Sequence, residues 1–132
     1  RAPSVEAVVE HIAKSTGERV SQSGASAANL LGISTQNPSR QVYWTSGPSR
    51  HLKLGAQSVE LKHVPNWQLR APNSRAGHAF RALAYFGKSE AAQALTRIKA
   101  TLNEEEQREL LSLRASAPTW MAKELSALAP SQ

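Results

Sequence analysis

The 132-residue sequence predicts an α+β domain, in which a small antiparallel sheet of three to four strands packs with N-terminal helices and a C-terminal helical array. Three observations predict this class. Apolar residues recur at helical spacing after Ser4, short segments of alternating character follow one another from residue 41 to residue 64, and helical spacing returns beyond residue 80. The length is that of one domain, residues 1–132.

The N-terminal region predicts two helices around a short strand. Ser4 is a suitable N-cap for a helix that should end at Gly17. Residues 18–22 alternate as a short strand would, and the Ala-rich residues 25–31 predict a compact helix that ends at Gly32.

Three strands are expected next, at residues 41–45, 51–54 and 58–64, joined by short glycine-containing turns as an antiparallel meander. Alternation in the first strand puts Val42 and Trp44 on one side and Tyr43 and Thr45 on the other. Four cations should lie on the exposed face or edges of the sheet: Arg40, Arg50, Lys53 and Lys62.

The C-terminal half predicts helices that end near Gly87, cover residues 91–102 and begin again at Asn103. Asn103 and Glu106 have the spacing of a capping box. A fourth helix should be capped by Ser116 or Thr119.

Composition limits the function classes. The net charge of +6 comes mostly from residues 1–75, which hold nine Lys/Arg against four Glu. This charge favours an acidic partner such as nucleic acid, or it is only a solvated surface. The absence of Cys removes thiolate chemistry and fits a cytoplasmic protein, and no segment is long and apolar enough for a membrane.

No motif for catalysis or for a cofactor is complete. Gly87-Lys88-Ser89 lacks the first glycine of a phosphate loop, because Ala82 stands in its place. Glu60 and Lys62 match part of a nuclease site, yet the two preceding strands offer no second acid. The four histidines lack metal-ligand spacing, so we expect no enzyme, no cofactor and no metal.

Several segments of the sequence resemble the AbiEi-type antitoxin family of type IV toxin–antitoxin systems. The similar positions are Ser23-Gly24-Ala25-x-Ala27-Ala28-Asn29-x-Leu31-Gly32-Ile33-Ser34-Thr35-Gln36-x-Pro38, Tyr43-x-Thr45-x-Gly47-x-Ser49-Arg50 and Val59-x-Leu61-Lys62-His63. The resemblance covers about half of the chain, includes the spacing between the segments, and adds little in the helical tail.

The resemblance implies a domain that acts by binding, as an antitoxin and transcriptional autorepressor. Its partners would be a nucleotidyltransferase-type toxin and operator DNA, the DNA mainly through an N-terminal winged-helix domain that has no counterpart here. The chain would then be the C-terminal part of a longer protein. Association into a homo-oligomer is compatible with this assignment. The alternative is a basic nucleic-acid-binding module without a toxin partner.

Seven residues are candidates for partner or nucleic-acid contact: Asn29, Thr35, Gln36, Arg40, Arg50, Lys53 and Lys62. The polar loop could equally be turn chemistry, with Asn29 and Thr35 capping backbone groups. The basic strands combine cations with Tyr43 and Trp44, which suits phosphates and stacked bases. Trp44 shares the register of Val42, however, and that register also fits a core residue.

Overall fold

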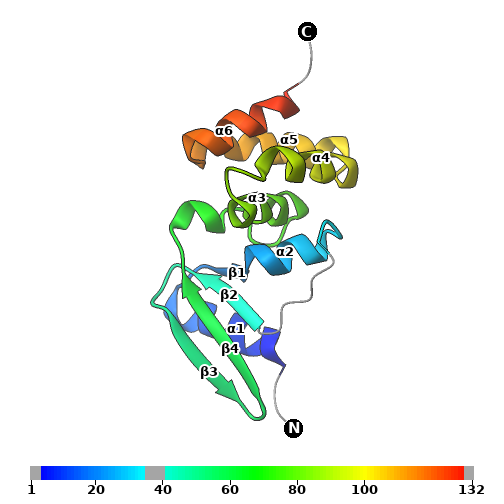
Figure 1. Cartoon of the computed structure of the whole chain (residues 1–132). Coiled ribbons are helices and arrows are strands. Elements are labelled where there is room, and N and C mark those ends of the chain that lie inside the picture. The colour runs from blue at the N-terminus through cyan, green and yellow to red at the C-terminus, as the bar shows by residue number, and fades with distance from the viewer. Residues whose placement is uncertain (1–3, 35–40, 130–132) are drawn as a thin grey trace.

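The computed structural model describes residues 4–34 and 41–129. Within these ranges a four-stranded sheet and six α-helices confirm the α+β class (Figure 1). The elements are α1 (Val5–Thr16), β1 (Val20–Gln22), α2 (Gly24–Leu30), β2 (Gln41–Thr45), β3 (Arg50–Leu54), β4 (Gln57–His63), α3 (Arg75–Phe86), α4 (Ala91–Thr101), α5 (Glu104–Ser112) and α6 (Thr119–Leu125). Short 3₁₀ turns cover Asn66–Leu69, Leu113–Ser116 and Ser126–Leu128.

Local capping sets several of the helix ends. The Ser4 hydroxyl accepts the Ala7 N–H at 3.1 Å, and Gly17 ends α1 with φ +78°. Asn103 and Glu106 form the predicted capping box. The predicted cap of the last helix is wrong, because Pro118, whose backbone is already extended there, occupies the N-cap position of α6.

The sheet has the strand order β1-β2-β4-β3 and is mixed. The pairs β1–β2 and β3–β4 are antiparallel, whereas β2 and β4 run parallel. The predicted antiparallel pairing of β3 with β4 is therefore confirmed, whereas the pairing of β2 with β3 and the wholly antiparallel sheet are wrong. Residues 46–49 do not form a hairpin turn; they carry the chain from β2 past the end of β4 to the outer position of β3.

Helix α1 covers one face of the sheet. Val5 and Val9 of α1 pack against Tyr43, Val59 and Leu61 from β2 and β4. On the other face, Trp44 of β2 packs with Val64 and Leu69. The predicted alternation of β2 is thus confirmed, and Trp44 is a core residue with 7% exposure.

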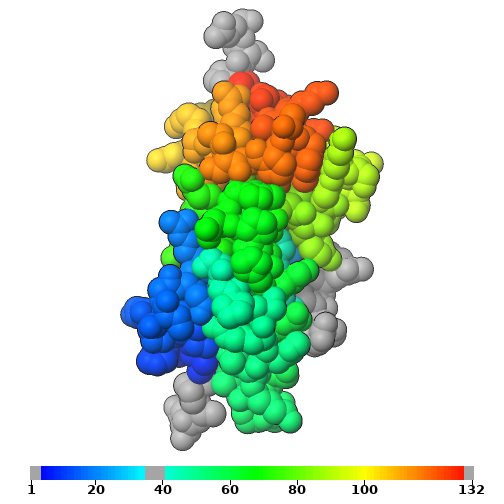
Figure 2. Space-filling view, turned by 90° about the vertical axis from the view of Figure 1, so that its left-hand side faces the viewer, coloured from blue at the N-terminus to red at the C-terminus, as the bar shows by residue number. Residues whose placement is uncertain are grey.

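The helices beyond β4 build a second core. Phe80 and Leu83 of α3 lie at its centre, fully buried among α2, α4, α5 and α6. Sheet and α1 form one end of the molecule and α4 to α6 the other (Figures 1 and 2). Among the described helices, none has the length and apolar character needed to cross a membrane.

Candidate binding surface

The segment that connects β2 to β3 is held by a half-buried carboxylate. Glu18, two residues before the start of β1, accepts a hydrogen bond from the Thr45 hydroxyl at 2.6 Å. Arg50 donates to both of its oxygens, at 3.2 and 2.8 Å. These contacts join the start of β1, the end of β2 and the start of β3 into one cluster.

Electrostatics keep Glu18 ionised. The hydrogen bond from Arg50 is the main cause that lowers the pKa of Glu18 to about 2, with a smaller contribution from Thr45, against the opposing effect of burial. Only 10% of the Glu18 side chain is exposed. A carboxylate so fully engaged by neighbouring donors stabilises the fold and is poorly suited to act as a general base.

The Glu18 carboxylate also explains why residue 47 is a glycine. A Cβ at Gly47 would collide with the Glu18 carboxylate oxygen. The Gly47 N–H also donates to the Thr45 hydroxyl at 3.0 Å, and the Gly47 carbonyl lies 2.9 Å from His63 Nδ1. The Ser49 hydroxyl accepts the His63 N–H at 2.8 Å. The spacing Thr45-x-Gly47-x-Ser49-Arg50 is therefore required by the crossing from β2 to β3.

Arg50 and the two lysines are on different faces of the sheet. Arg50 pairs with Leu61 and lies on the side of α1, whereas Lys53 pairs with Ser58 on the opposite side. Lys62 shares that opposite side because it pairs with Trp44. The predicted grouping of Arg50 with the lysines is therefore corrected: Arg50 belongs to the Glu18 cluster.

Three exposed residues with basic side chains form what we call the open face: His51, Lys53 and Lys62, all on the side of β3 and β4 opposite α1. Glu60 lies among them and is half-buried. This face can attract phosphates or carboxylates. In the described parts of the chain, no group of three or more His, Cys, Asp or Glu could hold a metal ion.

The remaining candidates lie elsewhere. Asn29 lies in the last turn of α2 and is half-buried, and its carbonyl accepts the Gly32 N–H at 3.0 Å. Thr35, Gln36 and Arg40 lie outside the described residues. Whether these residues contact a partner stays a prediction.

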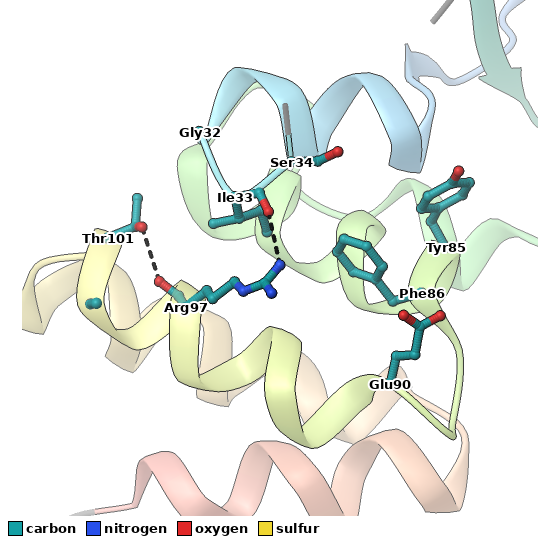
Figure 3. Close-up of a pocket in the computed structure, with 9 residues that line it drawn as sticks. Gly32, Ile33, Ser34, Tyr85, Phe86, Glu90, Arg97 and Thr101 are labelled. Atoms are coloured by element: carbon teal, nitrogen blue, oxygen red, sulfur yellow. Dashed lines mark hydrogen bonds between the residues drawn. The ribbon is translucent and has the colours of Figure 1, made fainter. Parts of the chain in front are cut away.

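A hollow of about 880 Å³ lies between the end of α2 and helices α3 and α4 (Figure 3). Tyr85, which is 52% exposed, and Phe86 place their ring centres 5.6 Å apart beside it. Arg97 reaches across from α4 and donates to the Ile33 carbonyl at 3.3 Å. The sequence offered little signal for this hollow, because its residues come from three separate segments.

A buried arginine was also missed. Arg81 of α3 has 0% exposure and donates to the carbonyls of Arg70 and Pro72 at 3.2 and 3.0 Å. Burial lowers the pKa of Arg81 to about 10, and burial together with Arg81 lowers the pKa of the adjacent His78. In sequence Arg81 stands between Phe80 and Ala82 without any pattern that distinguishes it from a surface arginine.

Comparison with known proteins gives one family. The model of the family of unknown function DUF6088 matches residues 1–110, so the chain belongs to that family. Searches of curated proteins and of solved structures found no match.

Proposed function

We propose that this member of the DUF6088 family is an antitoxin domain of an AbiEi-like system, which acts in the cytoplasm by binding and without catalysis. The observation that carries the proposal is the convergence of the resembling positions. Thr45, Gly47, Arg50 and His63 come from different strands and loops, yet they form one connected cluster around Glu18. Residues that lie far apart in the sequence and meet in one cluster are residues on which this fold depends.

The same convergence suggests where function resides. Because Thr45, Gly47 and Arg50 build the crossing from β2 to β3, we expect partner contact at exposed positions on the scaffold, of which Lys62 is itself a resembling position. The open face formed by His51, Lys53 and Lys62 is one such surface, and it offers positive charge to a nucleotidyltransferase-type toxin with a complementary acidic patch.

Growth rescue tests this proposal. Cells would express a candidate nucleotidyltransferase-type toxin taken from a neighbouring gene, with and without the 132-residue chain. We expect rescue by the chain, and loss of rescue when Lys53→Glu and Lys62→Glu are combined. The matched control is the double variant Lys99→Glu and Lys123→Glu, which makes the same charge change at exposed positions of α4 and α6.

Expression and folding of each variant are verified by immunoblot and circular dichroism. Continued growth arrest in the presence of folded wild-type chain would refute antitoxin activity for this domain. Equal rescue by both double variants would refute the role of the open face while leaving antitoxin activity in place.

The open face also favours a second function, which is direct nucleic-acid binding within a transcriptional autorepressor. Lys53 and Lys62 are exposed on one side of two adjacent strands, a geometry that can contact consecutive phosphates. Operator recognition itself would reside mainly in a winged-helix domain preceding this one. Binding of a DNA duplex that does not weaken as salt rises would exclude this function, since phosphate contacts release counterions.

A further inference from the structure

The outer edge of β3 is a free sheet edge in the described structure. β3 ends the strand order, and its only strand partner is β4. The opposite edge is the three-residue β1, which offers much less backbone. A sheet edge presents unpaired N–H and C=O groups to which another extended chain can bind.

The hairpin geometry identifies which groups point outward. Leu54 and Gln57 close a two-residue turn in which Gly55 has φ +63° and Ala56 has no positive φ, as in a type II′ turn. Leu54 and Gln57 therefore exchange both backbone hydrogen bonds, and bonded pairs alternate along the ladder. It follows that the N–H and C=O groups of His51 and Lys53 point away from β4.

The two sides of this edge differ in chemistry. Leu52 and Leu54 are half-buried at the margin of the cluster under α1, so their outer flanks lack cover among the described residues. On the other side, Lys53 and His51 are exposed. An added strand would gain apolar contact on the α1 side and ionic contact on the open face.

We propose that β3 binds an extended segment of a partner protein in which apolar residues alternate with acidic ones. Backbone hydrogen bonds to His51 and Lys53 would hold the segment, its apolar residues would cover Leu52 and Leu54, and its carboxylates would face Lys53. The proposal goes beyond the antitoxin proposal, because it defines the chemistry of the bound segment whatever protein supplies it.

Charge excludes a second copy of this strand as the favoured occupant. An antiparallel pair centred on Lys53 sets two lysines opposite each other, and a pair that uses both outward-facing residues sets Lys53 opposite His51, so neither pairing offers Lys53 a carboxylate. Like charges across a strand pair are destabilising. Lys53 thus protects the edge against self-association and remains complementary to an acidic strand.

Peptide binding to the full 132-residue chain tests the proposal. The probe is a capped peptide of alternating Glu and Val, compared with alternating Lys and Val and with a peptide in which the same Glu and Val residues are grouped into two blocks. We expect only the alternating acidic peptide to bind in calorimetric titration. Amide hydrogen exchange of His51 and Lys53 should slow on binding, because their N–H groups become bonded.

Two variants of Lys53 separate the contribution of its backbone N–H to peptide binding from that of its side-chain charge. Lys53→Pro removes an outward N–H without removing a bond to β4, and it should abolish binding. Lys53→Glu keeps the N–H and should weaken binding by about tenfold or more. Lys99→Glu on α4 makes the same charge change away from the edge and should bind as wild type.

Three results would overturn the inference. They are no binding of the acidic peptide at millimolar concentration, equal binding of the acidic and basic alternating peptides, and retained binding by folded Lys53→Pro together with folded Lys53→Glu. A DNA oligonucleotide that perturbs His51 and Lys53 while the acidic peptide does not would assign this edge to nucleic acid instead.

Discussion

Arg50 donates hydrogen bonds to Glu18 from both terminal guanidinium nitrogens, at 2.8 Å from Nη2 to Oε2 and at 3.2 Å from Nη1 to Oε1. The two residues are 32 positions apart in sequence, and the Arg50 Nη1 also donates to the Pro48 carbonyl. This bidentate contact fixes the direction in which the chain leaves β2, and with it the place of β3 outside β4.

The ion pair predicts an acid-sensitive stability. The pKa of Glu18 falls from 4.5 to about 2 on folding, so its stabilising contribution is complete above pH 4.5 and is lost as the pH falls toward 2. Arg50 is 29% exposed, and solvent screening limits the expected loss to about 1–2 kcal/mol. Urea unfolding from pH 7 to pH 2.5 measures it.

Glu18→Gln is the matched variant for this effect, because it keeps the shape and removes the charge. Relative to wild type, the variant should be less stable at pH 7, and the difference should shrink as the pH falls. A difference that stays constant with pH would show that Glu18 contributes through packing and neutral hydrogen bonds alone.

Gly47→Ala should destabilise the chain through Glu18. The added Cβ would collide with a carboxylate that Thr45 and Arg50 hold in place, and we expect a cost of about 1–3 kcal/mol. In a Glu18→Ala background the obstacle is gone, so the same substitution should cost much less. Chemical denaturation of the four proteins of this cycle gives the coupling, and purely additive effects would argue against the contact.

Sequence reasoning reached both ends of α1 and the start of α5 because their signals are local. Ser4 and Asn103 cap the turns that immediately follow them, and Gly17 supplies the left-handed conformation at the end of α1. These effects act within a few residues, so the segment itself contains the information.

Strand order could not be read in the same way. Four residues between β2 and β3 ordinarily suggest a hairpin, and only the pairing of β4 with both strands shows that β4 lies between them. The face of the sheet on which Arg50 lies could not be predicted for the same reason, since it depends on the register of β3 against β4.

Arg81→Met should destabilise the junction between sheet and helices. The guanidinium donates to the carbonyls of Arg70 and Pro72, which flank Ala71 at φ +51°. Loss of these two buried hydrogen bonds should lower the free energy of unfolding by about 2–4 kcal/mol. The net loss is smaller, because the variant no longer has to bury the charge of Arg81. Arg108→Met on the exposed side of α5 is the control. Equal urea midpoints for both variants would mean that the burial cost cancels the hydrogen bonds of Arg81.

The two faces of the sheet predict opposite behaviour for Arg50 and the lysines. Lys53→Ala and Lys62→Ala remove exposed charges, so melting temperature should stay nearly constant. If the open face binds DNA, each should also reduce the slope of log affinity against log salt by about 1. Arg50→Ala should instead lower the melting temperature, because it releases Glu18 and the Pro48 carbonyl. If folded Arg50→Ala keeps its stability and has a reduced salt slope, Arg50 contacts DNA and does not stabilise the Glu18 cluster.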